Sequence, residues 1–330
     1  MGSVKDLIVL REPTDKPGLG RFIFSDRYSV FDYGEMPDKI EGKGKALCMV
    51  SAFFFEKLEE EGIKTHYVGL VEDGKVKSFD EVGSAVNEME IKLVRVVKPE
   101  SGYSIFKKLK GNFLIPLEII YRNSIPEGSS LLRRIERGEV KPEDFGLSKI
   151  EAGMRLEKPI IDFSTKLEDV DRYLSHAEAK EISGLTDDEF EALKELVVRV
   201  NEIITREVGK AGLTNEDGKI EVALDEERNL MVVDAVGTPD ECRFSMDGFE
   251  VSKELLRKYY RKTEWYEKVK QLKGKEGWRE AVGKPPSLPE EVKEGISNLY
   301  KAFCNEIVGK RLFDAPRLKE VISHLKEVLE

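Results

Sequence analysis

Apolar residues in the first hundred positions fall in short runs, and this pattern predicts a β-rich region with one helix. Residues 7–10 (LIVL) and 21–25 (RFIFS) are brief apolar runs, separated by the turn-forming stretch EPTDKPGLG at 12–20. Residues 46–62 instead carry apolar side chains at helical spacing and end in glycine, which predicts a helix.

Strand-like patterns continue to residue 99, after which the sequence becomes polar and irregular. Residues 65–79 predict a hairpin that turns at 72–74, and residues 90–99 predict another strand. The polar, irregular stretch 100–112 then predicts a connection between two domains. The expected domains are residues 1–112 and 113–330.

The second half of the chain combines strands with long helices. Residues 186–212 place an apolar stripe at helical spacing behind a capping box of Thr186 and Glu189, which makes this the clearest helix of the chain. Three further segments have helical patterns: 251–272, 288–303 and 315–329. The whole pattern predicts an α+β protein with two lobes, an N-terminal antiparallel sheet carrying a helix and a larger α+β lobe.

Residues 218–234 predict a β-hairpin that brings two carboxylates together. Polar and apolar side chains alternate along GKIEVAL (218–224), and LMVVD (230–234) follows as a second strand after the acidic turn DEERN. A loop at 226–229 would place Glu221 directly opposite Asp234. Like charges in facing positions destabilise a ladder, so this pair calls for a counter-ion.

Glu221 and Asp234 are therefore candidate metal ligands. Two carboxylates on adjacent strands, without neutralising neighbours, suit a hard cation such as Mg²⁺ that also contacts substrate phosphates. The alternative is a solvent-facing hairpin in another register, since the predicted boundaries of strands shift by a few residues.

Basic residues supply two candidate anion sites. GKGK at 42–45 precedes the first helix, where backbone N–H groups and Lys43 would receive a phosphate; a solvated loop is the alternative. Arg122 emerges from an apolar strand and is followed by GSS at 128–130, which together offer a forked guanidinium and backbone donors. Taken alone, such a segment is more often an ordinary loop.

Composition and charge narrow the class of protein. The chain has 330 residues, of which 40% are hydrophobic and 36% charged, and Lys and Glu dominate the charged set, as in heat-adapted proteins. A net charge of −10 without a clustered basic stretch argues against a nucleic-acid partner. Three widely spaced cysteines, no apolar signal core and no apolar run of membrane-spanning length predict a cytoplasmic protein.

Several segments, taken in order, resemble the phosphoribosylaminoimidazole-succinocarboxamide synthase (SAICAR synthetase) family. The resemblance spans about residues 21–303, although GxxxxGK[ST], GxGxxG, HExxH and GxSxG motifs are all absent. The segments that carry it are SDRYSVFD (25–32), KIEGKGKALCMVSAFFFEKLEEEGIKTHY (39–67), PLEIIYRN (116–123) with the following GSS, PIIDFSTKLEDVDRYLS (159–175), DGKIEVALDEERNLMVVDAVGTPDECRF (217–244) and KPPSLPEEVKEGISNLYKAF (284–303).

The resemblance implies a ligase of purine biosynthesis with three small-molecule substrates. ATP would activate carboxyaminoimidazole ribonucleotide as an acyl phosphate, and L-aspartate would then form the amide; a homo-oligomer is compatible with this family. By resemblance, Lys219 and Asp240 are the catalytic candidates, and Lys219 and Glu221, with Lys43, would bind ATP. Glu221 and Asp234 would hold Mg²⁺. The implied substrate-binding residues are Ser29, Asp32, Arg122, Ser129, Lys166, Asp171 and Arg243.

The chain departs from the family pattern in three places. Family members usually begin with a GKxRDxY or RGKAKxxY strand that covers the ATP phosphates, a motif that is missing here, and Lys16 is the candidate substitute. Ala235 follows Asp234 where the family usually has an acidic residue, and 100–112 is a long insertion. A paralogous ligase or kinase on a related substrate, and a non-catalytic nucleotide-binding relative, are therefore the alternatives.

Overall fold

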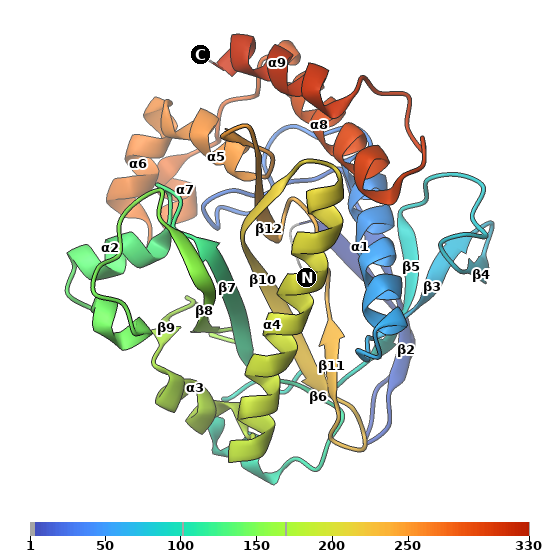
Figure 1. Ribbon diagram of the computed structural model, residues 1–330, viewed down its shortest axis with the longest axis vertical. Coiled ribbons are helices and arrows are strands. Elements are labelled where there is room, and N and C mark those ends of the chain that lie inside the picture. The colour runs from blue at the N-terminus through green and yellow to red at the C-terminus, as the bar shows by residue number, and fades with distance from the viewer. Residues whose placement is uncertain (1–3, 101, 169, 330) are drawn as a thin grey trace.

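The computed structural model describes residues 4–100, 102–168 and 170–329, and its N-terminal part is a five-stranded antiparallel sheet (Figure 1). Its strands lie in the order β1-β2-β5-β3-β4, and helix α1 (Lys43–Glu60) packs against β2, β3 and β5. The strands are β1 (Lys5–Arg11), β2 (Gly18–Phe24), β3 (Tyr67–Glu72), β4 (Lys75–Lys77) and β5 (Glu88–Leu93). The predicted strands, hairpin and helix of this region are confirmed.

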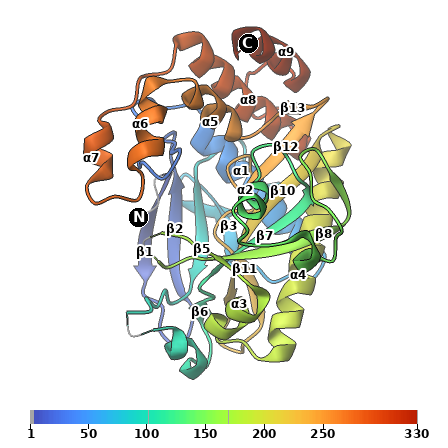
Figure 2. The same ribbon diagram turned by 90° about the vertical axis from the view of Figure 1, so that its left-hand side faces the viewer.

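A second, eight-stranded sheet is built around one long strand, β10 (Thr214–Leu224). The main path runs β13-β12-β10-β7-β8-β9, while β11 and β6 pair with the far end of β10. The other strands are β6 (Phe113–Leu114), β7 (Leu117–Ser124), β8 (Arg155–Thr165), β9 (Tyr173–Leu174), β11 (Leu230–Val233), β12 (Cys242–Met246) and β13 (Phe249–Glu250). Figure 2 shows the two sheets beside one another.

Helix α4 (Asp187–Lys210) covers one face of the second sheet and packs against β7, β8 and β10 (Figure 1). Its predicted capping box is confirmed: the Glu189 backbone N–H donates to the Thr186 hydroxyl at 3.2 Å, and the Thr186 N–H donates to the Glu189 carboxylate at 2.8 Å. Both contacts satisfy N–H groups at the helix start that otherwise have no partner.

The remaining helices lie in the connections and at the C-terminus. They are α2 (Ser130–Glu136), α3 (His176–Ser183), α5 (Glu254–Arg261), α6 (Glu264–Leu272), α7 (Trp278–Val282), α8 (Glu290–Val308) and α9 (Leu318–Leu329), with 3₁₀ turns η1 (Tyr103–Lys108) and η2 (Pro142–Phe145). Within the described ranges, no helix combines the length and apolarity needed to cross a bilayer.

Segment 251–272 forms two helices rather than the predicted single one. The chain breaks at residues 262–263, where the Thr263 side chain accepts the Tyr266 backbone N–H and so starts α6. The connection 100–112, expected to be irregular, contains the 3₁₀ turn η1.

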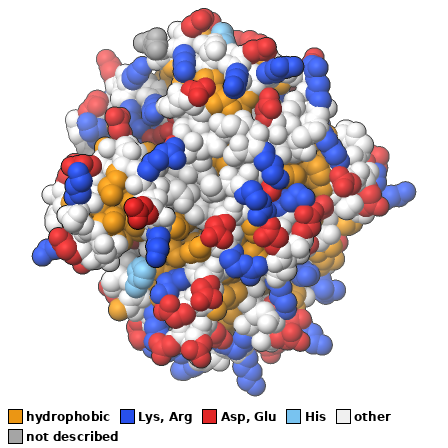
Figure 3. Space-filling model, viewed as in Figure 1, with side chains coloured by type: hydrophobic (Ala, Val, Ile, Leu, Met, Phe, Trp, Pro, Cys, Tyr) orange, Lys and Arg blue, Asp and Glu red, His pale blue; other side chains and the backbone are white. Residues whose placement is uncertain are grey.

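The C-terminal helices return to the N-terminal sheet, because α8 packs against both α1 and α9. One hydrophobic core therefore contains Phe24 and Ile91 of the first sheet, Phe244 of the second and Leu325 of α9. All strands of the first sheet precede residue 112, and all strands of the second sheet follow it. Because the two sheets share one hydrophobic core, the division into two domains at residue 112 stays a prediction. Charges of both signs are mixed over the face seen in Figure 3.

The β10–β11 hairpin differs from the predicted register by one residue. Glu221 pairs with Val233 and Leu224 with Leu230, so the loop has five residues and Asp234 lies beyond the strand with φ 70°. The cause is Asp225, whose side chain accepts the backbone N–H groups of Glu227 at 2.9 Å and Asn229 at 2.7 Å. This side-chain turn removes Asp225 from the ladder.

Candidate functional site

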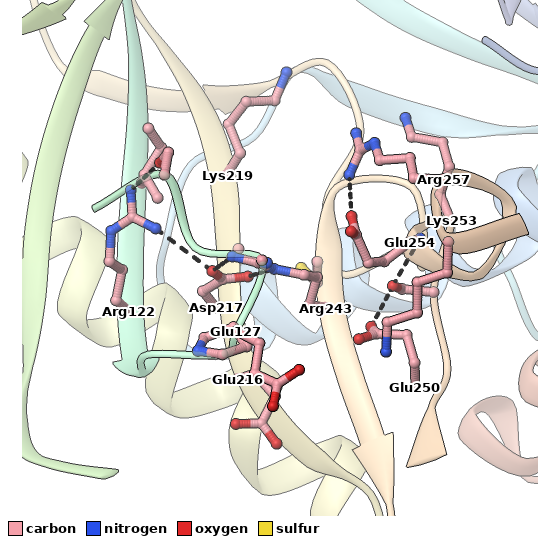
Figure 4. Close-up of a pocket in the computed structure, with 18 of the residues that line it drawn as sticks. Arg122, Glu127, Glu216, Asp217, Lys219, Arg243, Glu250, Lys253, Glu254 and Arg257 are labelled. Carbon is pink, nitrogen blue, oxygen red and sulfur yellow. Dashed lines mark hydrogen bonds and ion pairs between the residues drawn. The ribbon is translucent and has the colours of Figure 1, made fainter. Parts of the chain in front are cut away.

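A cleft of about 1670 Å³ opens over strands β7, β10 and β12 and is closed on its other sides by helices α2, α5 and α6. Six of the predicted site residues line it: Asp32, Arg122, Asp171, Lys219, Asp240 and Arg243. The other predicted residues are not part of its lining: Ser29, Lys43, Ser129, Lys166, Glu221 and Asp234. Figure 4 shows part of this cleft.

Two arginines meet over one carboxylate at the centre of the cleft. The ladders pair Asp217 of β10 with Arg122 of β7 on one side and with Arg243 of β12 on the other. Paired residues share a face of the sheet, so both guanidinium groups reach Asp217 (Figure 4). Arg243 Nε lies 2.8 Å from Asp217 Oδ1, and Arg122 Nη1 lies 3.6 Å from Asp217 Oδ2. Sequence reasoning missed Asp217, because its role depends on strand pairing.

Further contacts hold Arg122, which is only 2% exposed. Its Nη2 lies 3.1 Å from Asp162 Oδ2, and the same oxygen accepts Arg134 Nη1 at 2.6 Å. This arginine centre, defined by Arg122, Arg134, Arg243, Asp162 and Asp217, therefore has three positive charges against two negative ones. An excess of guanidinium groups suits a phosphate or carboxylate.

Ser129, the serine expected at this centre, accepts Arg122 Nη1 at 3.4 Å but does not line the cleft. Ser129 is fully buried, and its hydroxyl accepts the Leu131 backbone N–H as the N-cap of α2. Ser130 lines the cleft instead and accepts Arg122 Nη2 at 3.1 Å. The sequence run GSS supplied the correct turn, but not which hydroxyl would face the cleft.

Alternating lysines and carboxylates continue along the same face of β10. Lys219 Nζ lies 3.0 Å from Glu118 Oε1 and 3.2 Å from Glu241 Oε2. Lys166 Nζ lies 2.6 Å from Glu221 Oε1 and 3.3 Å from Glu118 Oε1. We call Glu118, Lys166, Lys219 and Glu221 the lysine–carboxylate row. Burial opposes the charge of Lys219, but the carboxylates of Glu241, Glu221 and Glu118 outweigh it and raise the pKa of Lys219.

Asp234 lies close to this row, and the expectation that it and Glu221 lack neutralising neighbours is wrong. Lys5 Nζ of β1 is 2.6 Å from Asp234 Oδ1, while Lys166 contacts Glu221. Burial and the Asp234 charge raise the pKa of Glu221. Burial works against the charge of Asp234, but Lys5, Lys219 and Lys166 outweigh it and hold the pKa of this carboxyl below its usual range.

Lys5 is an N-terminal lysine near the acidic pair that the sequence pattern did not single out. Lys16, the expected substitute, is exposed in the β1–β2 turn, whereas Lys5 reaches the acidic pair from β1. Among the residues that the structure describes, no group of three or more His, Cys, Asp or Glu side chains is arranged to hold a metal. Glu221 and Asp234 would therefore suit a cation that takes its other ligands from phosphate and water.

The GKGK loop does not form an open anion site, which overturns the expected role of Lys43 in ATP binding. The backbone N–H groups of Gly42 and Gly44 donate to the Asp26 carboxylate at 3.2 Å and 2.9 Å. Lys43 is fully buried, and its Nζ lies 2.7 Å from Asp240 Oδ2. The Asp26 carboxylate therefore occupies the N–H groups at the start of α1 that a phosphate would need.

Asp240 forms part of the cleft floor in a buried cluster. Besides Lys43, it accepts the Tyr300 hydroxyl at 2.6 Å, and Lys253 Nζ lies 4.0 Å away. Burial opposes ionisation, but Lys43 and Lys253 keep the pKa of Asp240 well below its usual range. Asp240 is therefore ionised at neutral pH and held by three neighbouring side chains.

The loop 25–32 forms one lip of the cleft. Asp32 is exposed, its carboxylate lies 2.5 Å from Lys273 Nζ, and its backbone has φ 60°. Ser29 is half-buried in the same loop. Asp171 reaches the cleft from the segment before β9, and burial together with Glu118 raises the pKa of Asp171 to about 6.

Comparison with known proteins gives one consistent family. A family model described as SAICAR synthetase matches residues 2–272. An Archaeoglobus fulgidus protein named "Putative phosphoribosylaminoimidazole-succinocarboxamide synthase" is 83% identical, with 100% of each chain covered. A Thermoplasma acidophilum protein named phosphoribosylaminoimidazole-succinocarboxamide synthase is 36% identical over 88% of this chain and 93% of its own.

Solved structures agree on the fold. A SAICAR synthetase in complex with ADP has a TM-score of 0.62 at 22% identity, covering 94% of this chain and 97% of that chain. The Saccharomyces cerevisiae SAICAR synthase complexed with SAICAR has a TM-score of 0.64 at 23% identity, covering 94% of each chain.

Replacing Lys43 with Met should leave Asp240 buried with weaker compensation, and we expect a loss of about 3–5 kcal/mol in the free energy of unfolding at pH 7. The depressed pKa of Asp240 means that its ion pair stabilises the fold above the unfolded-state value, about 3.9, and loses this effect as the pH falls further. Urea unfolding should therefore show the gap between wild type and Lys43→Met narrowing below about pH 4.

Lys45→Met is the matched control, because Lys45 is an exposed lysine of the same helical turn. Its effect should stay within about 0.5 kcal/mol. Equal stability of the two variants would show that the Lys43–Asp240 contact is not a stabilising buried pair.

Proposed function

The chain belongs to the SAICAR synthetase family, and we propose that it joins L-aspartate to carboxyaminoimidazole ribonucleotide in an ATP-dependent ligation that yields the succinocarboxamide, ADP and phosphate. One observation carries the proposal: a single face of β10 presents the arginine centre and the lysine–carboxylate row in sequence. Asp217, Lys219, Glu221 and Ala223 occupy alternate positions of β10 and so share that face. The cytoplasmic location expected from the sequence is part of the same proposal.

The arginine centre is the proposed binding site of the ribonucleotide. Arg122 and Arg243 are pre-positioned by Asp217, and Ser130 adds a hydroxyl at the cleft surface. Side chains fixed before the ligand arrives lose little rotamer freedom on binding, which favours recognition of an anionic group. Asp240 lines the same cleft.

ATP is proposed to bind farther along β10, between the two sheets. Lys5 extends from β1 towards Asp234, and alternation puts Leu7 and Val9 on the same face of β1 as Lys5. At the matching end of β10, Leu114, Ala223, Met231 and Val233 form a small apolar cluster. An adenine would fit apolar side chains there, while Lys5, Lys166 and Lys219 would meet the phosphates.

The protein's own groups would act mainly by positioning and charge. Lys219 stays protonated next to Glu118 and Glu241, so it offers a fixed positive charge to a transferring phosphoryl group. Glu221 and Asp234 would hold Mg²⁺, which supplies further stabilisation of phosphoryl charge when bound. The ribonucleotide carboxylate, held at the arginine centre, would face the phosphates from the neighbouring position on β10.

The proposal is tested by following ADP release with each substrate omitted in turn. Dependence on ATP, the carboxylated ribonucleotide and L-aspartate is expected, with the succinocarboxamide identified by mass. ADP release that needs the ribonucleotide but is indifferent to aspartate would indicate a kinase. Binding without turnover would indicate a non-catalytic relative.

Replacing Arg243 with Ala should weaken binding of the ribonucleotide by roughly 2–4 kcal/mol, because a charge-assisted contact in a largely buried site is lost. ATP binding measured without ribonucleotide should change little. Calorimetric titration of each ligand checks both expectations.

Arg137→Ala is the control for this change, since Arg137 is an exposed arginine at the rim of the same cleft. An equal loss of ATP and ribonucleotide affinity in Arg243→Ala would contradict the assigned role.

Replacing Glu221 with Gln should preserve the fold and remove turnover. The raised folded-state pKa of Glu221 shows that its ionised form is disfavoured in the folded protein, so a neutral side chain should leave the melting temperature equal or higher. Turnover should fall by roughly a hundredfold or more, since a group that supports the metal is lost. Both are measured on one sample.

Glu226→Gln, in the exposed loop of the same hairpin, should change neither quantity. A marked loss of melting temperature in Glu221→Gln, or near-normal turnover, would make the Glu221–Asp234 pair structural.

A further inference from the structure

Ten carboxylates line the cleft, and most are already engaged by the protein. They are Asp32, Glu118, Glu127, Asp171, Glu216, Asp217, Asp240, Glu241, Glu250 and Glu254. Across residues 4–100, 102–168 and 170–329, eight of the ten contact a lysine, arginine or hydroxyl group. Glu127 and Asp171 make no such contact with the described residues, so their oxygens are available to a ligand.

The two differ in where they lie along the cleft. Glu127 precedes Gly128, which lies against Arg243, so it belongs to the end of the cleft at the arginine centre. Asp171 lies beside the lysine–carboxylate row. Its charged neighbours are Glu118 of β7, Lys166, Lys219 of β10 and Asp32 of the loop 25–32. Asp171 is therefore the unengaged carboxylate next to the groups proposed to handle phosphoryl transfer.

The backbone around Asp171 is fixed although its side chain is open to the cleft. The Thr165 N–H donates to the Arg172 carbonyl at 3.0 Å, and the Arg172 N–H donates to the Thr165 hydroxyl at 3.1 Å. These two bonds hold the residue after Asp171 against the end of β8. A carboxylate that is anchored through its backbone and free at its oxygens can meet a reacting group without reorganising.

We propose that Asp171 receives the amino group of the amino-acid substrate and accepts its proton as the amide bond forms. The inference rests on the proposed function and adds a residue to its second step. The ammonium group first loses one proton to solvent, and the free amine nitrogen then forms a bond to the acyl carbon. The bond from that carbon to the phosphate oxygen breaks, and the electron pair leaves with phosphate. The second proton, lost by nitrogen as the amide forms, passes to Asp171 and then to solvent, which its exposed side chain contacts.

Acid–base properties of the site agree with this geometry. Burial and Glu118 raise the pKa of Asp171 to about 6, although Lys166 acts in the opposite direction. A carboxylate with this pKa is mostly ionised at neutral pH and binds a proton more strongly than an ordinary aspartate. Its ionised form would also attract a substrate ammonium group before the reaction.

The test separates amide formation from acyl-phosphate formation in Asp171→Asn. Hydroxylamine is uncharged at neutral pH and traps acyl phosphates as hydroxamates without needing a strong base. Asp171→Asn should reduce aspartate-dependent amide formation by about 100-fold or more. Hydroxamate formed from ATP, ribonucleotide and hydroxylamine should stay within about threefold of wild type, the small change expected of a residue outside the first step.

The pH profile supplies a second readout. In wild type, kcat/KM for aspartate should fall as the pH drops through about 6, the pKa of Asp171. That limb should be absent from Asp171→Asn and retained in Asp171→Glu. Glu127→Gln is the matched control, because it removes the other unengaged carboxylate; it should keep the acid limb whatever its rate.

Equal loss of amide and hydroxamate in Asp171→Asn, with unchanged thermal unfolding, would overturn the inference and assign Asp171 to the first step or to binding. An unchanged acid limb in that variant would also overturn it. Failure of the proposed function has a different signature: wild type itself would then give neither hydroxamate nor aspartate-dependent ADP.

Discussion

The structure of the cleft depends on one constraint, that charged groups removed from water must find partners of opposite charge. Glu221 is 5% exposed and Asp217 is 5% exposed, yet both sit on the same face of β10, with Lys219 between them. Isolated charges at such depth would be strongly unfavourable. Other parts of the second sheet therefore supply counter-ions: arginines from the neighbouring strands β7 and β12 lie around Asp217, and Lys166, directly after β8, lies beside Glu221.

This constraint also explains which parts of the site could be predicted from the sequence. Arg122, Arg243, Lys219 and the two acidic residues of the hairpin are all identifiable, because a strand pattern and a family resemblance act on local sequence. The residues that pair with them cannot be identified in this way. Asp217 and Glu118 become significant only through strand pairing, and Lys5 meets Asp234 across more than two hundred residues of chain. Local periodicity carries no signal for such contacts.

The errors in the local predictions have specific physical causes. The predicted register of the hairpin is wrong by one residue because the Asp225 side chain accepts backbone N–H groups of its own loop. Alternation of polarity cannot reveal this effect. Lys43 was expected at a phosphate because it stands between glycines at a helix start, but Asp26 occupies those N–H groups. The strands and helices themselves were mostly predicted, since hydrophobic period and capping residues decide them.

The pairing of lysines with carboxylates has a consequence for substrate binding. Without a nucleotide, Lys5 and Lys166 neutralise Asp234 and Glu221. At the proposed nucleotide site, ATP would bring several negative charges close to these groups, and the ammonium groups would gain phosphate oxygens as new partners. The carboxylates would then need another cation, and this is the situation in which a metal held jointly by protein and phosphate becomes favourable. The same lysines would thus stabilise the buried carboxylates in the absence of nucleotide and, on changing partners, couple nucleotide binding to metal binding.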